Sequence, residues 1–449
     1  MSKELGFSNQ DIQSKEFLDV MTGNSIIENS KPFAMCYAGH QFGNWAGQLG
    51  DGRAINLGEI KNWAIQLKGA GPTPYSRTAD GLAVLRSSVR EYLCSEAMHH
   101  LGVPTTRALS LSLTGDQVLR DMMYDGNPAY EKGAIVSRVA KSFLRFGNFE
   151  LFAARNDLKN LKILTDYTIL HHFSHLGNPC KEVYLKFFQE VTNKTLEMIV
   201  HWQRVGFVHG VMNTDNMSIL GLTIDYGPYG WLEGFDLGWT PNTTDKKHKR
   251  YRYGNQPTIG LWNLYQLANA LYPLIDEAAP LEEILERYQQ DFKTESLHMM
   301  RSKLGLTLAK KNDSLLIESL EKNLQASETD MTIFFRKLSD FKKEFPEQGI
   351  KLVENAFYKI DEIHDDLLDN WQQWFCEYAK RLKEEPIPFS ERQKKMNKVN
   401  PKYVLRNYMA QLAIDKAETN DSSLIEELYQ ILKKPYEEQP EFEHWFAKR

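Results

Sequence analysis

The chain has 449 residues, of which 42% are hydrophobic, 12% aromatic and 25% charged, and this balance excludes a disordered or low-complexity protein. Its 54 basic and 59 acidic residues give a formal net charge of −5. An extended surface for a polyanion is therefore not expected, and we predict no nucleic-acid partner, although a local basic pocket could still hold a nucleotide.

The sequence also indicates the cellular compartment of the protein. No stretch approaches the roughly 18 to 20 apolar residues of a membrane helix, and residues 1–5 lack the basic-then-apolar plan of a signal peptide. The four cysteines lie far apart with no CxxC pair, which argues against a disulfide framework or a thiolate zinc site. We therefore predict a cytoplasmic protein with no membrane partner.

Short strands and glycine-rich turns are predicted first along the chain. Residues 54–58 and 63–68 have the pattern of strands, and the alternation in the second run places its apolar side chains on one face and Gln66 and Lys68 on the other. Glycine-rich stretches surround both runs. This composition indicates a β-rich unit whose backbone can approach a ligand closely.

A helix and further strands follow. Apolar residues recur at helical spacing over residues 82–101, and the Gly-Val-Pro that comes next ends the run. Residues 108–113 and 117–120 flank a Thr-Gly-Asp sequence and predict a β-hairpin. Residues 134–140 predict another strand. The first 140 residues are thus expected to form a small, mostly β unit with one helix.

The rest of the chain reads mainly as helix. Residues 167–176 and 184–204 are amphipathic, residues 206–256 form a strand and turn-rich insert, and helices dominate from 260 onward. An aromatic stripe at helical spacing predicts core packing: Trp371, Trp374, Phe375 and Tyr378. No internal repeat or long linker is present, so one two-lobed catalytic unit is favoured over separate modules.

Four residues occur in an informative order. Lys68 ends a strand before a glycine-rich turn, and Glu91 lies in the helix that follows. Asn216 ends the sequence His-Gly-Val-Met-Asn-Thr-Asp-Asn, and Asp225 begins Asp-Tyr-Gly. This is the order of parts in a protein kinase. We therefore predict an α+β, protein-kinase-like fold with a β-rich N-lobe (1–145), a mainly helical C-lobe (146–449) and a catalytic and metal-binding loop at 205–230.

Each part has a physical role near a nucleotide. A carboxylate such as Glu91 can hold the long side chain of Lys68 beside phosphates, and Asn216 and Asp225 offer hard oxygen ligands for Mg²⁺. Glycines let backbone N–H groups approach phosphate, and one arginine guanidinium can bind two phosphate oxygens at once. The candidates of these two kinds are Gly50, Gly52, Gly69, Gly71, Arg53, Arg138 and Arg145.

The departures from a kinase are equally informative. A kinase has its catalytic base five positions before the metal-binding asparagine, and here that position is Val211, which cannot accept a proton. The nearest carboxylate is Asp215. The chain has neither a GxGxxG loop nor a Walker motif. Nucleotide binding is therefore predicted, whereas γ-phosphoryl transfer in the usual geometry is not.

Seven longer motifs resemble the selenoprotein O family. They lie, in the order of that family, at residues 37–43, 48–54, 66–74, 85–91, 209–216, 255–257 and 400–407. The resemblance implies a pseudokinase fold that binds ATP in an inverted orientation. It also implies transfer of AMP to Ser, Thr or Tyr hydroxyls of proteins with release of pyrophosphate, so ATP and protein substrates are the predicted partners.

The resemblance also assigns roles to matching positions. Asp215 matches the family's proposed base, and Asn216 and Asp225 would bind Mg²⁺ or Mn²⁺. The nucleotide site would be formed by Gly50, Gly52, Arg53, Lys68, Asp80, Gly81, Glu91, Arg138 and Arg145. Inverting ATP presents its α-phosphorus to the incoming hydroxyl, which is consistent with an apolar Val211.

Other interpretations of these residues stay open in the sequence. A kinase of a small molecule or protein and a non-catalytic ATP-binding scaffold are the two rival functions. Glu91 could pair with Arg86 or Arg90 instead of Lys68, and the two arginines at 138 and 145 could be ion-pair residues. Outside the motifs, a histidine cluster at 171–175 lacks the glutamate of a zinc motif and is expected to be structural.

Overall fold

The computed structural model describes residues 1–122 and 126–448. Its strands are β1 (Cys36–Gln41), β2 (Asn44–Gly50), β3 (Ala54–Ile60), β4 (Trp63–Lys68), β5 (Arg107–Arg120), β6 (Ala129–Ala140), β7 (Phe207–Val208) and β8 (Gly230–Trp231). Its helices are α1 (Ser2–Leu5), α2 (Asn9–Ile12), α3 (Lys15–Met21), α4 (Leu85–His100), α5 (Phe146–Ala154), α6 (Leu158–His172), α7 (Lys181–Val205), α8 (Gln256–Ile275), α9 (Ala278–Lys303), α10 (Asp313–Ala326), α11 (Met331–Leu338), α12 (Gly349–Leu352), α13 (Asp365–Lys383), α14 (Phe389–Val399), α15 (Asn407–Glu418) and α16 (Ser423–Leu432). The predicted α+β class is confirmed.

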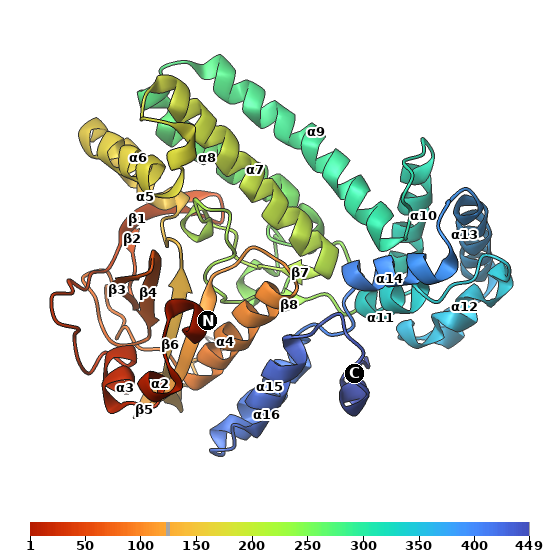
Figure 1. Ribbon diagram of the computed structural model, residues 1–449, viewed down its shortest axis with the longest axis horizontal. Helices are drawn as coiled ribbons and strands as arrows, with labels where there is room; N and C mark the ends of the chain where they lie inside the picture. Colours follow the sequence, from red (N-terminus) through yellow and green to blue (C-terminus); the bar gives the residue numbers. More distant parts are fainter. Residues whose placement is uncertain (123–125, 449) are drawn as a thin grey trace.

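A four-stranded antiparallel sheet with the order β3-β4-β6-β5 forms the centre of the first 140 residues (Figure 1). On one face, Ile65 of β4 and Val139 of β6 pack against the short helices α1 and α3. The opposite face presents Gln66 and Lys68, with Arg138 directly across from Gln66 in β6. The predicted alternation along β4 is thus confirmed, and residues 64–68 are buried on both faces of the strand.

The predicted hairpin at residues 108–120 is wrong. β5 runs as one strand from Arg107 to Arg120 and pairs with β6 on both sides of the Thr-Gly-Asp sequence, with a register shift between Leu113 and Gln117. The neighbouring β6 is long enough to bond both halves, so the extra residues bulge out of the ladder instead of reversing the chain. The sequence reading also missed α1, α2 and α3.

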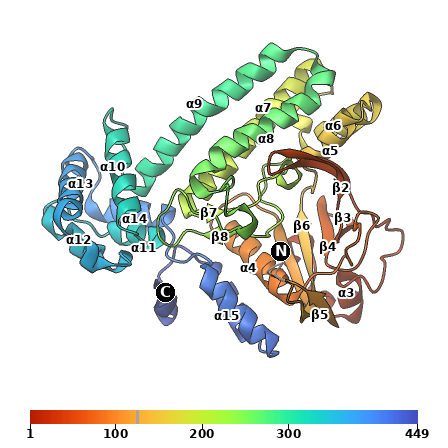
Figure 2. The same ribbon diagram turned by 180° about the vertical axis from the view of Figure 1, so that it is seen from behind.

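Strands β1 and β2 form a hairpin that the sequence analysis describes only as glycine-rich. β1 and β2 pair with each other through a two-residue turn, in which Phe42 and Gly43 both have positive φ, at 51° and 85°. This is the conformation of a type I′ hairpin turn. In Figures 1 and 2 the hairpin lies beside α5, apart from the four-stranded sheet.

Helices form most of the chain after residue 146 (Figure 2). Helices α7, α8 and α9 pack against one another, and α15 and α16 pack against α4. The predicted aromatic stripe on α13 is confirmed as core, because all four of its rings are at most 2% exposed. Within residues 1–122 and 126–448, no helix combines the length and apolarity needed to span a membrane.

Candidate active site

Lys68 and Glu91 meet where the sheet faces α4. Lys68 ends β4, and its Nζ lies 2.5 Å from Oε2 of Glu91, whose other oxygen lies 3.0 Å from a guanidinium nitrogen of Arg138. Burial raises the pKa of Glu91, but Lys68 and Arg138 outweigh this effect and keep it below the usual value. Glu91 is therefore a buried anion that orients two cations. Arg86 and Arg90, which the sequence allowed as alternative partners of Glu91, make other contacts. Arg86 binds Glu131, and Arg90 donates to the carbonyl of Tyr229.

Asp225 is held opposite this pair by the loop that precedes it. His209 is buried, and its Nε2 lies 2.8 Å from the carbonyl oxygen of Ile224. Burial lowers the pKa of His209, so the ring is neutral and Nε2–H donates to that carbonyl. Asp225 then adopts a left-handed conformation with φ of 56°. The histidine of the loop motif is thus a structural residue that fixes the position of Asp225.

Two arginines bind the carboxylate of Asp225. A guanidinium nitrogen of Arg138 lies 2.6 Å from Oδ1, one of Arg145 lies 2.6 Å from Oδ2, and Nζ of Lys68 is 4.0 Å from Oδ1. Burial raises the pKa of Asp225, but the three cations, Arg145 most strongly, hold it well below its usual value. The predicted phosphate-binding arginines and the predicted metal ligand therefore form one charged network.

A cavity of about 790 Å³ gathers most of the predicted site residues, and this volume is typical of sites for nucleotide-sized ligands. Those that line it are Gly52, Arg53, Lys68, Asp80, Gly81, Arg138, Asn216 and Asp225, together with Val211. Glu91 and Arg145 lie behind this wall, bonded to Lys68 and Asp225. Gly50 lies under the ring of Tyr75, which a side chain at position 50 would meet. A second cavity of equal volume lies between α7, α9 and α14 and contains none of the predicted residues.

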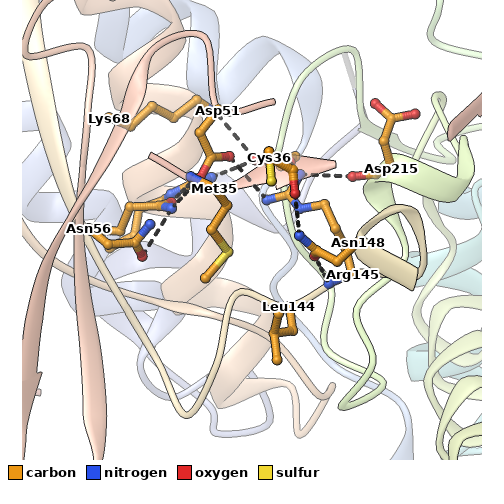
Figure 3. Close-up of polar contacts among 12 residues, drawn as sticks. Met35, Cys36, Asp51, Asn56, Lys68, Leu144, Arg145, Asn148 and Asp215 are labelled. Carbon is orange, nitrogen blue, oxygen red and sulfur yellow. Dashed lines mark hydrogen bonds and ion pairs between the residues drawn. The ribbon is translucent and has the colours of Figure 1, made fainter. Parts of the chain in front are cut away.

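Asp215 is close to this network but does not line the cavity. Its main-chain carbonyl accepts a hydrogen bond from Arg145 at 2.8 Å, while its carboxylate is turned away from that arginine (Figure 3). The Nε2 amide group of Gln41 donates to Oδ2 at 3.1 Å, and Oδ1 is buried without a partner among the described residues. Burial raises the pKa of Asp215 to about 6. A carboxylate with these properties can accept a proton near neutral pH.

Two residues of the cavity wall that lie beside Arg145 were not predicted from the sequence. Asp51 is 3% exposed, accepts a hydrogen bond from Gln66, and lies 3.7 Å from Arg145 (Figure 3). Burial raises its pKa. Tyr37 also lines the cavity, with the guanidinium carbon of Arg145 4.5 Å from its ring centroid. Both residues belong to motifs quoted above, and the carboxylate within a glycine-rich turn was the available signal for Asp51.

The residues present fit a divalent cation that also binds phosphate. Asn216 donates through Nδ2 to the carbonyl of Val211 at 2.9 Å, which leaves its side-chain oxygen free to act as a ligand, and Asp225 lines the same cavity. In the part of the chain that the structure describes, no three His, Cys, Asp or Glu residues form a metal cage. Mg²⁺ commonly takes one or two protein oxygens and completes its shell from phosphates and water.

Comparison with known proteins identifies the family. The model of the family "Protein adenylyltransferase SelO" matches residues 1–433. The chain belongs to this family. Among similar proteins are three named "Protein nucleotidyltransferase YdiU": from Flavobacterium johnsoniae (62% identical, covering 99% of this chain and 86% of that protein), Rhodopirellula baltica (55%, 99% and 86%) and Aromatoleum aromaticum (54%, 99% and 86%). The predicted resemblance to selenoprotein O and the predicted class of nucleotidyltransferase are thus confirmed.

Proposed function

We propose that this SelO-family adenylyltransferase binds ATP in the 790 Å³ cavity and transfers AMP to a Ser, Thr or Tyr hydroxyl of a protein. One observation carries the proposal. Lys68, Arg138 and Asp225 share a cavity wall on which Val211 occupies the position of a kinase base. The wall therefore has groups for phosphates and metal but none that would activate a hydroxyl at the usual place. The rival scaffold function has no need for this charged network.

The proposed arrangement is that of a two-lobed pseudokinase, with lobes at residues 1–145 and 146–449. Lys68 and Arg138 would contact the outer phosphates, with Arg145 holding Asp225 from behind. Asn216 and Asp225 would bind Mg²⁺ or Mn²⁺, and Asp225 would exchange an arginine contact for the ion. When bound, this ion would stabilise negative charge on the phosphate oxygens.

The reaction follows from the inverted nucleotide. The hydroxyl oxygen of the substrate attacks the α-phosphorus, the bond from that phosphorus to its bridging oxygen breaks, and pyrophosphate leaves. Asp215 accepts the hydroxyl proton, and its pKa of about 6 keeps it largely ionised at neutral pH. Because its carboxylate is turned toward Gln41, transfer of the proton requires the side chain to rotate toward the cavity when a hydroxyl binds.

Position-specific labelling of ATP tests the proposal. The chain is incubated with a divalent metal and either α-labelled or γ-labelled ATP, and label is followed on the chain itself and on lysate proteins. We expect label from the α-position only. Label from the γ-position would establish kinase chemistry and refute the mechanism, and label from neither position would favour the scaffold.

A further inference from the structure

A strongly basic segment follows the catalytic loop. Residues 246–252 read Lys-Lys-His-Lys-Arg-Tyr-Arg, in a chain whose net charge is −5. The side chains of Lys246, Lys247 and Lys249 are exposed, and none of the three forms an ion pair with a described residue. Three unpaired lysines within four residues therefore give this segment a local positive charge on a net acidic protein.

The segment is fixed against the catalytic loop by buried hydrogen bonds. The carboxylate of Asp245, itself 1% exposed, accepts from the backbone N–H groups of Arg250 and Tyr251 at 2.9 and 2.7 Å. The hydroxyl of Tyr251 donates to Oδ1 of Asn213 at 2.6 Å. Asn213 lies two residues before Asp215. The exposed lysines therefore belong to a rigid turn beside the proposed base.

Aromatic side chains of the β1–β2 hairpin extend the same surface. Phe42 packs on Tyr251 with ring centroids 5.3 Å apart, and its backbone N–H donates to the Tyr251 hydroxyl at 3.0 Å. Phe42 and Trp45 are 37% and 45% exposed. The guanidinium carbon of Arg250 lies 4.7 Å from the ring centroid of Trp262, and its Nε has no partner among described residues.

We propose that this surface binds an acidic segment of the protein substrate and brings its hydroxyl to Asp215. We call it the basic rim, formed by Lys246, Lys247, Lys249 and Arg250 with the exposed rings of Phe42 and Trp45. Three observations select this partner: unpaired positive charge on a net acidic protein, exposed aromatic surface for a polypeptide, and fixation to the loop that contains Asp215. Charge complementarity of this kind raises encounter rates and selects partners. The inference rests on the proposed function, because only a protein hydroxyl requires a docking surface there.

Neutralisation of the rim tests the proposal. The variant K246Q/K247Q/K249Q removes three exposed charges and no buried contact. The probes are synthetic peptides with one tyrosine flanked by glutamates, by glutamines or by lysines, assayed with α-labelled ATP and Mn²⁺. We expect the wild type to prefer the glutamate peptide, and the variant to raise KM for that peptide about tenfold without changing KM for ATP. The preference should weaken as salt is added.

The matched control is K383Q/K394Q/K398Q, which makes the same change in net charge on exposed lysines of α13 and α14 that are likewise unpaired among the described residues. Figures 1 and 2 both place α13 and α14 at the opposite end of the molecule from β1 and β2. This control should leave peptide KM unchanged. The proposal is overturned if the wild type does not distinguish the glutamate from the glutamine peptide, or if both triple variants behave alike. It is also overturned if RNA or duplex DNA, but not the peptide, loses affinity in the rim variant. Failure to label any peptide or the chain itself would instead refute the proposed function.

Discussion

Replacing Asp225 by asparagine tests whether one carboxylate neutralises the cations of the site. The change keeps the size of the side chain and removes its charge. Arg138 would retain Glu91, but the only carboxylate left near Arg145 among the described residues would be Asp51 at 3.7 Å. Its other contacts, the carbonyl of Asp215 and the ring of Tyr37, are neutral. Breaking a buried ion pair costs about 3–5 kcal/mol, and the 22% exposure of the Asp225 side chain reduces this. We expect Asp225→Asn to lower the free energy of unfolding by about 2–3 kcal/mol and to abolish AMP transfer.

Urea unfolding near neutral pH measures the effect, with Asp80→Asn as the control for an exposed pair. Asp80 and Arg120 are 43% and 28% exposed, so their separation should cost less than about 1 kcal/mol. Because the folded-state pKa of Asp225 is held below its usual value, the stabilisation is present above about pH 4 and is lost as the pH falls through the folded value. The two variants should therefore differ at neutral pH and converge in acid. Equal unfolding free energies at neutral pH would refute the assigned network.

Single buried residues give three further tests. Lys303 is 2% exposed, its Nζ donates to the carbonyl oxygen of Arg204 at 2.9 Å, and burial holds its pKa well below the usual value. The wild type should therefore gain stability between neutral pH and about pH 10, and Lys303→Met should remove this gain in urea titrations; a variant that keeps the gain would contradict the assignment. Gly81 has φ of 73°, and a Cβ at this position would lie 2.1 Å from the carbonyl oxygen of Gly71. Gly81→Ala should therefore lower the melting temperature and weaken ATP binding measured by calorimetry. Wild-type values for both quantities would argue against this close approach. Glu91→Gln removes the negative charge that lies 2.5 Å from Nζ of Lys68 and should lower kcat for AMP transfer at least about tenfold. A change in KM for ATP alone would restrict the pair to binding.

Local sequence patterns were sufficient for much of the fold. The strands around Trp63–Lys68 and the helix Leu85–His100 were predicted because period-2 and period-3.6 alternation reports burial directly. The hairpin at 108–120 failed because turn residues specify a reversal only when no neighbouring strand can pair with both halves. The β1–β2 hairpin was missed because its glycines obscure alternation.

The sequence by itself determined which chemical groups the protein has and their order: a strand lysine, a helix glutamate, a loop asparagine and an aspartate before a turn, with valine in place of a kinase base. Only the tertiary structure decided which of them meet. Glu91 binds Lys68 and Arg138 instead of its helix neighbours, and the Asp215 carboxylate turns to Gln41. These pairings join β4, α4, β6 and the loop after α7, and their strength depends on burial and on distances of a few ångströms. Spacing along a chain cannot report either quantity, because both arise only when distant elements pack together.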